Sequence, residues 1–435
     1  MTTEVRVSVL NTSDIGGTAF TPLFLGFHDG SFDVYNRGEV ASAGLEALAE
    51  DGNNAPIAEE LVAADADAQA VNLLGTTPAG GPGPIAAGTR ASTIVAVDGV
   101  SNGSFSFASM LLPSNDAFFG TGEAVQLFDA SGSFQGAQTF VFEGSNVLDA
   151  GTEVNTELDA AFINQTGPNT GEDENGVVAL HPGFNGSFGN PVGDGDQIIL
   201  GGTNAFGQFI DPEAADFTLP GAEVATVHVN TVNRIEGDDS GEFIRGGRDD
   251  DIVSGEGGND LILGRSGWDV LNGGDGKDTI FGGSGSDEIY GDAGRDALFG
   301  GRGNDLIHGG DGQDVIGGGR DDDSISGGDG FDQINGGSGD DVISGGADFD
   351  ILFGGRGNDH FLFSDGSDID AIRDYDRRGD DTLVLEVEGV DSYEDAVSFA
   401  RDKASGVKFD FGDGDILFLA GVSLSDLTED DFFFI

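Results

Sequence analysis

The chain has 435 residues, with 79 acidic and 18 basic side chains and a formal net charge of −61 at pH 7. That length predicts two or three domains, and the charge excludes nucleic acid as a partner because no basic patch is available to meet phosphates. The chain has no Cys, which excludes disulfides and thiol chemistry. A large acidic excess is typical of cation binding, or of a salty habitat where salt screens the repulsion.

The first residues, MTTEVRVSVLNTSD, lack a charged segment followed by an apolar run. The sequence therefore predicts no N-terminal secretory signal. No uninterrupted apolar run approaches the length that a membrane-spanning helix needs, so we expect no membrane span.

Residues 1–236 predict a first domain that is mainly β. Alternating apolar residues predict strands over Glu4–Leu10, Ser104–Leu112 and Ala225–Asn230. Two helical patterns, Glu39–Glu50 and Ala55–Ala64, interrupt the strands. Such elements predict a β-sandwich.

Glycine and proline punctuate the rest of this domain. The run between Thr76 and Pro84 holds three prolines and three glycines, which predicts a surface loop.

His28 follows an apolar segment and is the strongest candidate for a catalytic base. However, the chain has neither a His-Glu-x-x-His motif nor a Gly-x-Ser-x-Gly motif, and no nucleophile and base are seen to converge. We therefore predict no catalytic site.

Several short motifs occur in this domain in a fixed order. They are Thr21-Pro-Leu23, Gly26-Phe-His28, Arg37–Glu50, Ser109–Gly120 and Asp149–Glu157. This ordered set resembles the spondin N-terminal domain, known from the extracellular matrix protein F-spondin. The resemblance implies a β-sandwich with a calcium ion at one edge.

The resemblance also implies a set of metal ligands in this domain. They map onto Asp116, Asp149 and Glu153. The family has Asp at the last position, and the Glu found here is one methylene longer. The alternative is that these carboxylates accept hydrogen bonds from backbone N–H groups in turns.

Residues 237–362 divide without insertion into fourteen nonapeptides, such as Gly300-Gly-Arg-Gly-Asn-Asp-Leu-Ile-His308. The sixth position is Glu242 in the first unit and Asp in all the others. The aspartates are Asp251, Asp260, Asp269, Asp278, Asp287, Asp296, Asp305, Asp314, Asp323, Asp332, Asp341, Asp350 and Asp359.

The eighth position of every unit is apolar. One short strand with one inward apolar residue cannot fold alone, so the units must stack. If two units make one turn, residues eighteen apart lie above one another. The column is Ile244, Val253, Ile262, Leu271, Ile280, Ile289, Leu298, Ile307, Ile316, Ile325, Ile334, Ile343, Leu352 and Phe361.

Stacking places each sixth-position carboxylate above another, and like charges repel. Ca²⁺, which accepts flexible cages of carboxylate and carbonyl oxygens, would remove that repulsion. Glycine at the first, second and fourth positions permits φ > 0 in the loops. The fourth position is Asp249, Asp321 or Asp348 in three units, and Asp tolerates left-handed geometry better than most residues.

This pattern resembles the RTX repeat of bacterial calcium-binding parallel β-rolls. The resemblance implies a calcium-loaded β-roll with Ca²⁺ bound at the aspartates. An acidic, glycine-rich disordered linker is the alternative, but disordered segments lack a strict period of apolar residues.

Residues 363–435 predict a C-terminal cap with strands over Asp381–Val387, Gly406–Phe411 and Asp415–Leu419. A helix is predicted from Asp391 to Lys403, with Asp391 and Glu394 at capping-box spacing and Gly406 as its stop. We expect Ala396, Phe399 and Ala400 to pack on the strands. A solenoid needs such a cap at its open end.

The cap resembles that of serralysin-type proteases, without their zinc site. Its last residues, Asp430–Ile435, resemble a type I secretion signal, with acidic residues before a short apolar end. The resemblance implies the type I secretion apparatus as a partner. An ordinary final strand is the alternative.

Together these features predict a secreted, extracellular or cell-surface calcium-binding protein that is not an enzyme. Adhesion or matrix organisation, with an extracellular protein or glycan as partner, is the leading hypothesis. The alternatives are an extracellular hydrolase with an unrecognised site and a self-assembling surface-layer or filament subunit.

Overall fold

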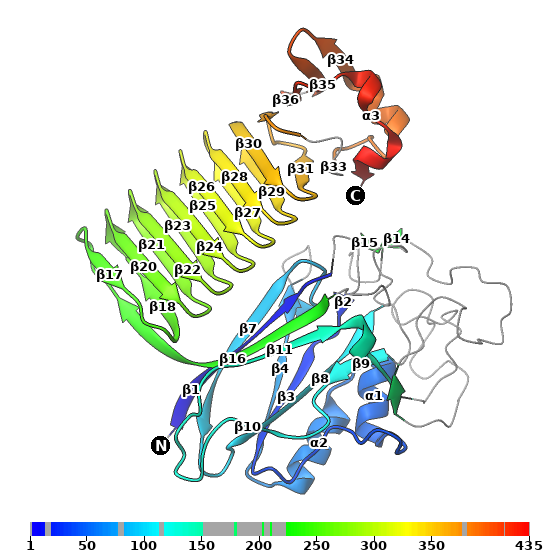
Figure 1. Cartoon of the computed structure of the whole chain (residues 1–435), viewed down its shortest axis with the longest axis vertical. Coiled ribbons are helices and arrows are strands. Elements are labelled where there is room, and N and C mark those ends of the chain that lie inside the picture. The colour runs from blue at the N-terminus through cyan, green and yellow to red at the C-terminus, as the bar shows by residue number, and fades with distance from the viewer. Residues whose placement is uncertain are drawn as a thin grey trace, which may run out of the picture. The chain divides into compact units, whose positions relative to one another are not determined.

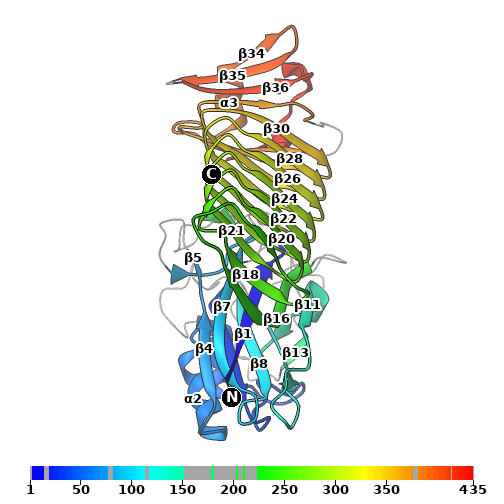
Figure 2. The same cartoon turned by 90° about the vertical axis from the view of Figure 1, so that its left-hand side faces the viewer.

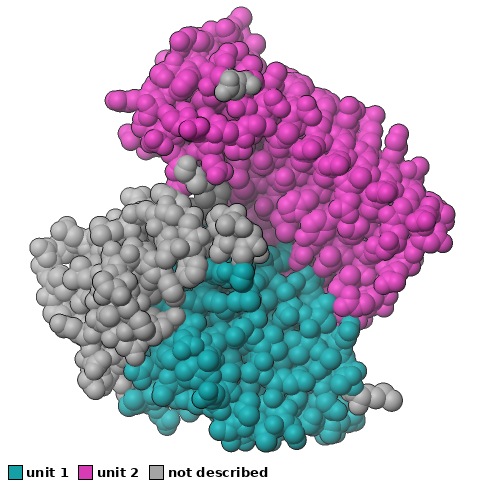
Figure 3. Space-filling model, turned by 180° about the vertical axis from the view of Figure 1, so that it is seen from behind, with its two compact units in different colours: residues 1–231 teal, residues 232–435 magenta. Residues whose placement is uncertain are grey.

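The computed structural model describes residues 2–13, 19–76, 82–112, 117–150, 178–180, 202–203, 209–210, 223–375, 381–412 and 414–434. The chain divides into two compact units, residues 1–231 and 232–435 (Figure 3). Most described elements are strands (Figure 1), as predicted. The predicted boundaries after residues 236 and 362 stay a prediction. Within the described residues, no helix is long and apolar enough to cross a membrane.

Unit 1 contains two antiparallel sheets. The first has the order β7 (Arg90–Asp98), β1 (Thr2–Asn11), β16 (Glu223–Glu236) and β11 (Gln138–Glu143). The second has the order β4 (Gln69–Leu73), β3 (Leu23–His28), β8 (Ser104–Leu112), β9 (Ala117–Gly120), β12 (Leu148–Asp149) and β13 (Ala179–Leu180), with β2 (Ala19–Phe20) and β10 (Val125–Gln126) also paired to β8.

The remaining short elements of unit 1 are a 3-10 turn, Gly144–Asn146, and two pairs of short strands. Strands β5 (Gly75–Thr76) and β6 (Pro82–Gly83) pair inside the segment predicted as a loop. Strands β14 (Gly202–Thr203) and β15 (Phe209–Ile210) form the other pair.

The two sheets of unit 1 pack against each other around one apolar core, which confirms the predicted sandwich. Val7 and Val227 of the first sheet and Phe27 and Phe107 of the second are buried in the same cluster. Aromatic rings meet edge to face within it; Phe107 and Phe142, for example, have ring centroids 5.6 Å apart.

Two helices add a third layer on the outer face of the second sheet. Helices α1 (Ala43–Asp51) and α2 (Ala55–Ala64) bury Leu45 and Ile57 against the β3/β8 sheet. This layer explains why β8 is buried along its whole length. Helix α1 starts later than the predicted Glu39, because Ser42 is its N-cap and accepts a hydrogen bond from the Leu45 N–H group.

Unit 2 is built on two parallel sheets that form a β-solenoid. In one sheet, residues Val232–Glu236 of β16 are followed by β18 (Asp250–Ser254), β21 (Val270–Gly276), β23 (Glu288–Gly294), β25 (Leu306–Gly312), β27 (Ser324–Asp329), β29 (Val342–Ala347), β31 (His360–Ser364), β33 (Thr382–Glu386) and β37 (Phe432–Phe434), and β19 (Gly257–Gly258) pairs with β21. This set is the odd sheet.

The other sheet is the even sheet, and its strands form a ladder in Figure 2. Its order is β17 (Phe243–Arg245), β20 (Leu261–Ser266), β22 (Thr279–Ser284), β24 (Ala297–Arg302), β26 (Val315–Arg320), β28 (Gln333–Ser338), β30 (Phe349–Arg356), β32 (Ile369–Ile372), β36 (Asp415–Ala420), β35 (Gly406–Gly412) and β34 (Ala400–Lys403), the last two being antiparallel additions.

The strand register confirms the predicted stacking. Ile262 pairs with Ile280, and Ile280 pairs with Leu298, so residues eighteen apart in the sequence are neighbours. Every eighth-position residue is buried in one cluster between the two sheets. The core of the repeats is therefore a column supplied by one side chain per strand.

The C-terminal strands continue both sheets, because β32 pairs with β30 and β33 pairs with β31. Helix α3 (Tyr393–Phe399) lies on them, with Ala396 buried and Phe399 against Phe411 at 5.6 Å between ring centroids. Two short 3-10 turns, Leu424–Asp426 and Glu429–Asp431, precede β37.

The predicted capping of this helix was wrong by one residue. Ser392 is the N-cap and accepts the Asp395 N–H bond, so Asp391 lies outside the helix. At the other end, Ala400 begins strand β34, and Gly406 lies in the β34–β35 hairpin, paired with Lys403.

We expect the apolar column to dominate the stability of the repeats. Ile307 is fully buried, whereas Val315 is 40% exposed on the even sheet. Ile307→Ala should lower the free energy of unfolding by about 2–5 kcal/mol. Val315→Ala should cost less than about 1 kcal/mol. Urea denaturation in saturating calcium measures both, and equal losses would show that the column is not the core.

Candidate calcium sites

The sixth-position aspartates form two buried columns that run along the solenoid. The backbone N–H group of each donates a hydrogen bond to Oδ1 of the aspartate eighteen residues later. One column continues from Glu242 through Asp260, Asp278, Asp296, Asp314, Asp332 and Asp350. The other contains Asp251, Asp269, Asp287, Asp305, Asp323, Asp341 and Asp359 and continues to Asp381.

The second carboxylate oxygen, Oδ2, of several column aspartates has no hydrogen-bond partner in the described part of the chain. Each of these Oδ2 atoms is buried and accepts no hydrogen bond from the described residues. A buried acceptor without a partner is costly, and a cation would satisfy it. The atoms belong to Asp260, Asp278, Asp296, Asp314, Asp323, Asp332, Asp341 and Asp350.

A backbone carbonyl faces the same space as the carboxylate. A Cβ built on Gly255 would lie 2.5 Å from Asp260 Oδ2 and 2.5 Å from the Gly273 carbonyl oxygen. Carboxylate and carbonyl oxygens are the ligands that Ca²⁺ prefers. The donor set of each loop therefore fits calcium.

The first-position glycines thus have a role different from the predicted one. Gly283 and Gly285, at the second and fourth positions, have φ values of +122° and +121°, as predicted. Gly255 and its first-position counterparts do not have φ > 0; they are glycines because a Cβ would collide with the aspartate oxygen. At the fourth position, Asp321 and Asp348 take φ values of +72° and +81°, so these loops form without glycine.

Without a bound cation, burial favours the neutral form of the carboxyl groups in the two columns. Burial, followed by the charge of Asp305, raises the pKa of Asp323 to about 10. Burial likewise raises the pKa of Asp341 to about 8 and that of Asp296 to about 7. A bound cation would favour the charged form.

Side chains alone do not make these sites. In the described part of the chain, no three His, Asp or Glu side chains converge where they could hold a metal. Backbone carbonyl oxygens must therefore supply part of each repeat site.

Of the predicted metal ligands of unit 1, Asp116 and Glu153 lie outside the described residues. Asp149 ends β12, where its backbone pairs with Ala117 of β9. The metal assignment of Asp116, Asp149 and Glu153 stays a prediction.

Both ring nitrogens of His28 make structural hydrogen bonds. Its Nδ1 accepts the Gly30 N–H bond at 3.1 Å, so the neutral ring carries its proton on Nε2 and donates it to Ser106 Oγ, 3.1 Å away. A general base for Ser106 would need the opposite tautomer. Burial also lowers the pKa of His28, and Ser106 is fully buried.

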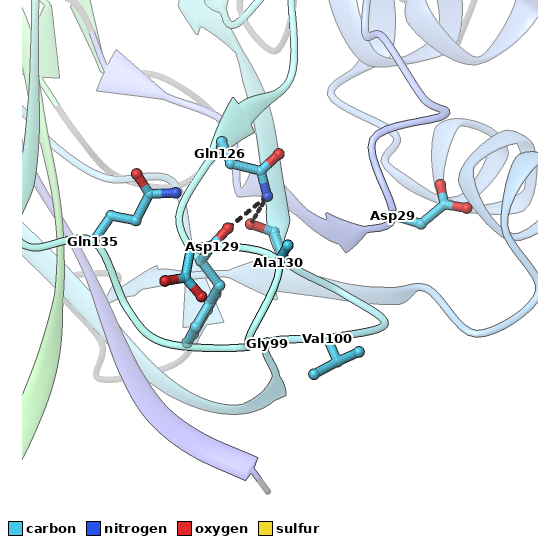
Figure 4. Close-up of a pocket in the computed structure, with 9 residues that line it drawn as sticks. Asp29, Gly99, Val100, Gln126, Asp129, Ala130 and Gln135 are labelled. Atoms are coloured by element: carbon cyan, nitrogen blue, oxygen red, sulfur yellow. Dashed lines mark hydrogen bonds between the residues drawn. The ribbon is translucent and has the colours of Figure 1, made fainter.

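A surface hollow of about 410 Å³ lies in unit 1 (Figure 4). Asp29, Gln126 and Asp129 are among its lining residues, which include neither His28 nor Ser106. Gln126 Nε2 is held by the carbonyl oxygens of Gly103 and Phe128, and the Asp129 carboxylate accepts hydrogen bonds within its own turn. The hollow offers no nucleophile paired with a base.

Comparison with known proteins identifies both parts of the chain. The Spondin_N family matches residues 15–167. The RTX calcium-binding nonapeptide repeat matches six overlapping segments between residues 236 and 370. The chain therefore contains a Spondin_N domain and RTX repeats, and the repeats bind Ca²⁺. Neither family is enzymatic.

No curated protein matches the chain. Among solved structures, the crystal structure of extracellular lipase LipA from Serratia marcescens is similar at 18% identity and a TM-score of 0.20. The alignment covers 46% of this chain and 40% of the lipase chain. The chain thus spans less than half the length of that enzyme, and nothing about activity follows.

We predict that Asp314→Asn removes calcium from the repeats. Asn keeps the shape and the Oδ1 acceptor for the Asp296 N–H bond but replaces Oδ2 by a donor. Each lost site should cost about 2.7 kcal/mol when calcium is near 100 times Kd. Asp311→Asn, an exposed change in the same loop, is the control. Native mass spectrometry counts the bound ions, and equal counts in the two variants would contradict the prediction.

We also predict that Gly255→Ala weakens calcium binding, because the new Cβ would displace Asp260 Oδ2 and the Gly273 carbonyl. The cost in folding free energy should be about 1–3 kcal/mol. Gly317→Ala is the matched control, since its Cβ would meet only the Phe299 ring, at 3.4 Å. Calcium titrations followed by circular dichroism compare them. If Gly255→Ala folds at the wild-type calcium concentration, the first-position glycine does not make room for the carboxylate.

Proposed function

We propose that this protein is a secreted, calcium-dependent binding module that acts in adhesion or cell-surface organisation and is not an enzyme. The observation that carries the proposal is an exposed apolar face on the even sheet. Every large apolar side chain that the structure describes as exposed in unit 2 lies there. They are Phe243, Leu261, Phe281, Val315, Phe349, Phe353 and Ile369.

Aromatic side chains make part of this apolar face flat. Phe281 and Phe299 stack with ring centroids 5.0 Å apart and an angle of 17° between their planes. Phe331 and Phe349 stack in the same manner at 5.5 Å and 12°. Because parallel strands repeat every ~4.8 Å, such side chains form a ladder. Exposed apolar patches mark interaction sites in soluble proteins.

Positive charge accompanies the apolar face. Arg302, Arg320 and Arg356 end strands β24, β26 and β30, and all three are exposed. Arg302 and Arg320 are direct neighbours in the register. None of the three makes an ion pair with the described residues. In a chain of net charge −61, these guanidinium groups favour a partner that has anionic groups next to an apolar or sugar-ring surface.

Calcium would control this function through the fold. The apolar face exists only while the strands of the even sheet are stacked, and the stacking brings the aspartate columns together. Free calcium is high outside cells and low inside them, so the face would form after export. We assign export to the type I apparatus; RTX repeat proteins are typically secreted.

The Spondin_N domain supports the same role. Spondin domains of matrix proteins serve as interaction modules, which is an analogy at the level of the fold. Against a hydrolase stand the tautomer of His28 and the unreactive lining of the hollow beside Asp29. The proposed partner is an extracellular protein or glycan.

The test compares two double variants. Phe281→Ser with Phe353→Ser removes two aromatic rings from the apolar face. Leu306→Ser with Val342→Ser replaces two apolar side chains on the half-buried outer side of the odd sheet and serves as the control. Binding of purified, calcium-loaded chain to washed producing cells is measured by fluorescence. The first variant should lose binding at least about tenfold, equivalent to 1.4 kcal/mol, and the second should retain it.

Wild-type binding that persists in chelator, or equal losses in the two variants, would contradict the proposal. Light scattering of the same samples identifies the partner as a second copy if concentration-dependent assembly occurs and is lost only in the Phe281/Phe353 variant.

A further inference from the structure

The two edges of the solenoid carry opposite charges. The chain leaves the strands of the even sheet through loops at one edge and the strands of the odd sheet through loops at the other. At the second and third positions of the nonapeptides, the charged residues that follow even-sheet strands are all basic, and those that follow odd-sheet strands are all acidic. The basic residues are Arg248, Arg265, Arg302, Arg320 and Arg356, and the acidic residues are Asp238, Asp239, Glu256, Asp275, Asp292, Asp311 and Asp329.

These side chains form two exposed rows, called here the basic edge and the acidic edge. Arg302 pairs with Arg320 in the register of the even sheet, and Asp311 pairs with Asp329 in that of the odd sheet. Because neighbouring strands lie ~4.8 Å apart, each pair brings two like charges together. No ion pair with the described residues neutralises any of these four side chains.

Charges at the fourth and fifth loop positions reduce the contrast between the edges without reversing it. The acidic edge also holds Lys277, Arg295 and Asp348, and the basic edge also holds exposed Asp249, Asp321, Asp322 and Asp340. Acidic residues still far outnumber basic ones on the acidic edge, whereas on the basic edge they do not. In a chain of net charge −61, the concentration of arginines on one edge is therefore a local exception.

The two rows match each other in position as well as in sign. Asp311 lies nine residues after Arg302 and nine before Arg320, which is half a turn from each. Both rows repeat once per turn, so a copy shifted sideways would place Asp311 and Asp329 opposite the two arginines at the same spacing. A two-fold axis would instead bring one edge against itself, and like charges would repel.

We propose that the basic edge of the solenoid binds the acidic edge of a second copy of this chain, with the two solenoids parallel and side by side. The contact joins two different surfaces, so it can repeat from copy to copy. It requires calcium, since the rows exist only when the turns are stacked. It rests on the proposed function in one respect, because it names a second copy as the anionic partner of the arginines beside the apolar face.

The test measures assembly of the full chain in saturating calcium by sedimentation velocity over a range of concentrations. The wild type should assemble as its concentration rises. Arg302→Glu with Arg320→Glu places acidic charges on both edges, and Asp311→Arg with Asp329→Arg places basic charges on both. Each variant alone should need at least about tenfold more protein to assemble. An equal mixture of the two should assemble as the wild type does, because acidic edges again meet basic ones.

The matched control is Lys277→Glu with Arg295→Glu. It reverses two exposed basic charges, as the first variant does, but on the acidic edge, and it should retain assembly. Circular dichroism checks that each variant folds. If a reversed variant does not fold, Arg302→Gln with Arg320→Gln removes the charges without reversing them and should still weaken assembly. Wild-type assembly of a folded Gln variant would overturn the proposal.

The remaining outcomes separate this proposal from the proposed function. A wild type that stays monomeric, or a mixture of the two reversed variants that does not assemble, would overturn the proposal. Assembly that is lost in Phe281→Ser with Phe353→Ser but kept in the arginine variant would assign self-association to the apolar face, which also overturns it. Edge-dependent assembly of a chain that does not bind cells would support this proposal and contradict only the proposed function.

Discussion

The repeat region depends on one contact repeated along two columns: the backbone N–H group of an aspartate donates to the carboxylate of the aspartate one turn later. In the middle of the solenoid this bond is 2.8 Å long between Asp296 and Asp314 and between Asp305 and Asp323. The contact fixes the loops in register, but it also collects buried carboxylates at the spacing of neighbouring strands. The same geometry therefore organises the fold and creates an electrostatic cost that only protons or cations offset.

The two units form their hydrophobic cores in different ways. Unit 1 packs two sheets and a helical layer around clustered aromatic rings. The repeats of unit 2 contribute one eighth-position side chain per strand, and much of their remaining polar interior is the aspartate columns. Calcium bound only by the folded form would add stability with every site. The apolar face on the outside of the even sheet would be formed as a consequence.

Much of this architecture could be predicted because it is periodic. The nine-residue repeat, the apolar eighth position and the stacking of residues eighteen apart all follow from spacing, and the register of Ile262 with Ile280 confirms them. The role of the first-position glycine could not be predicted, since it depends on where the Asp260 oxygen lies rather than on the backbone angles of Gly255. The register of Asp350 with Asp370 could not be predicted either, because two inserted residues shift it, whereas strict counting arrives at Asp368.

Elements outside the repeats were predicted less well, because contacts distant in the sequence and local backbone geometry decide their structure. Strand β8 begins with an alternating pattern but is buried on both faces, because helices that are distant in the sequence cover its outer side. The N-cap Ser392 was missed because the neighbouring Asp391 offers the same local signal, and only the backbone geometry decides between them.

Hydrogen exchange with peptide-level mass spectrometry tests the central claim most directly, because the full chain contains its own control. In calcium, the amides of residues 237–362 should be protected, including the Asp296 and Asp314 N–H groups that bond to the next aspartate. In chelator these amides should exchange freely, while strands β1, β3 and β8 of unit 1 stay protected. Protection of the repeat amides that persists in chelator at neutral pH would contradict the account, since the aspartate columns would then stack without calcium.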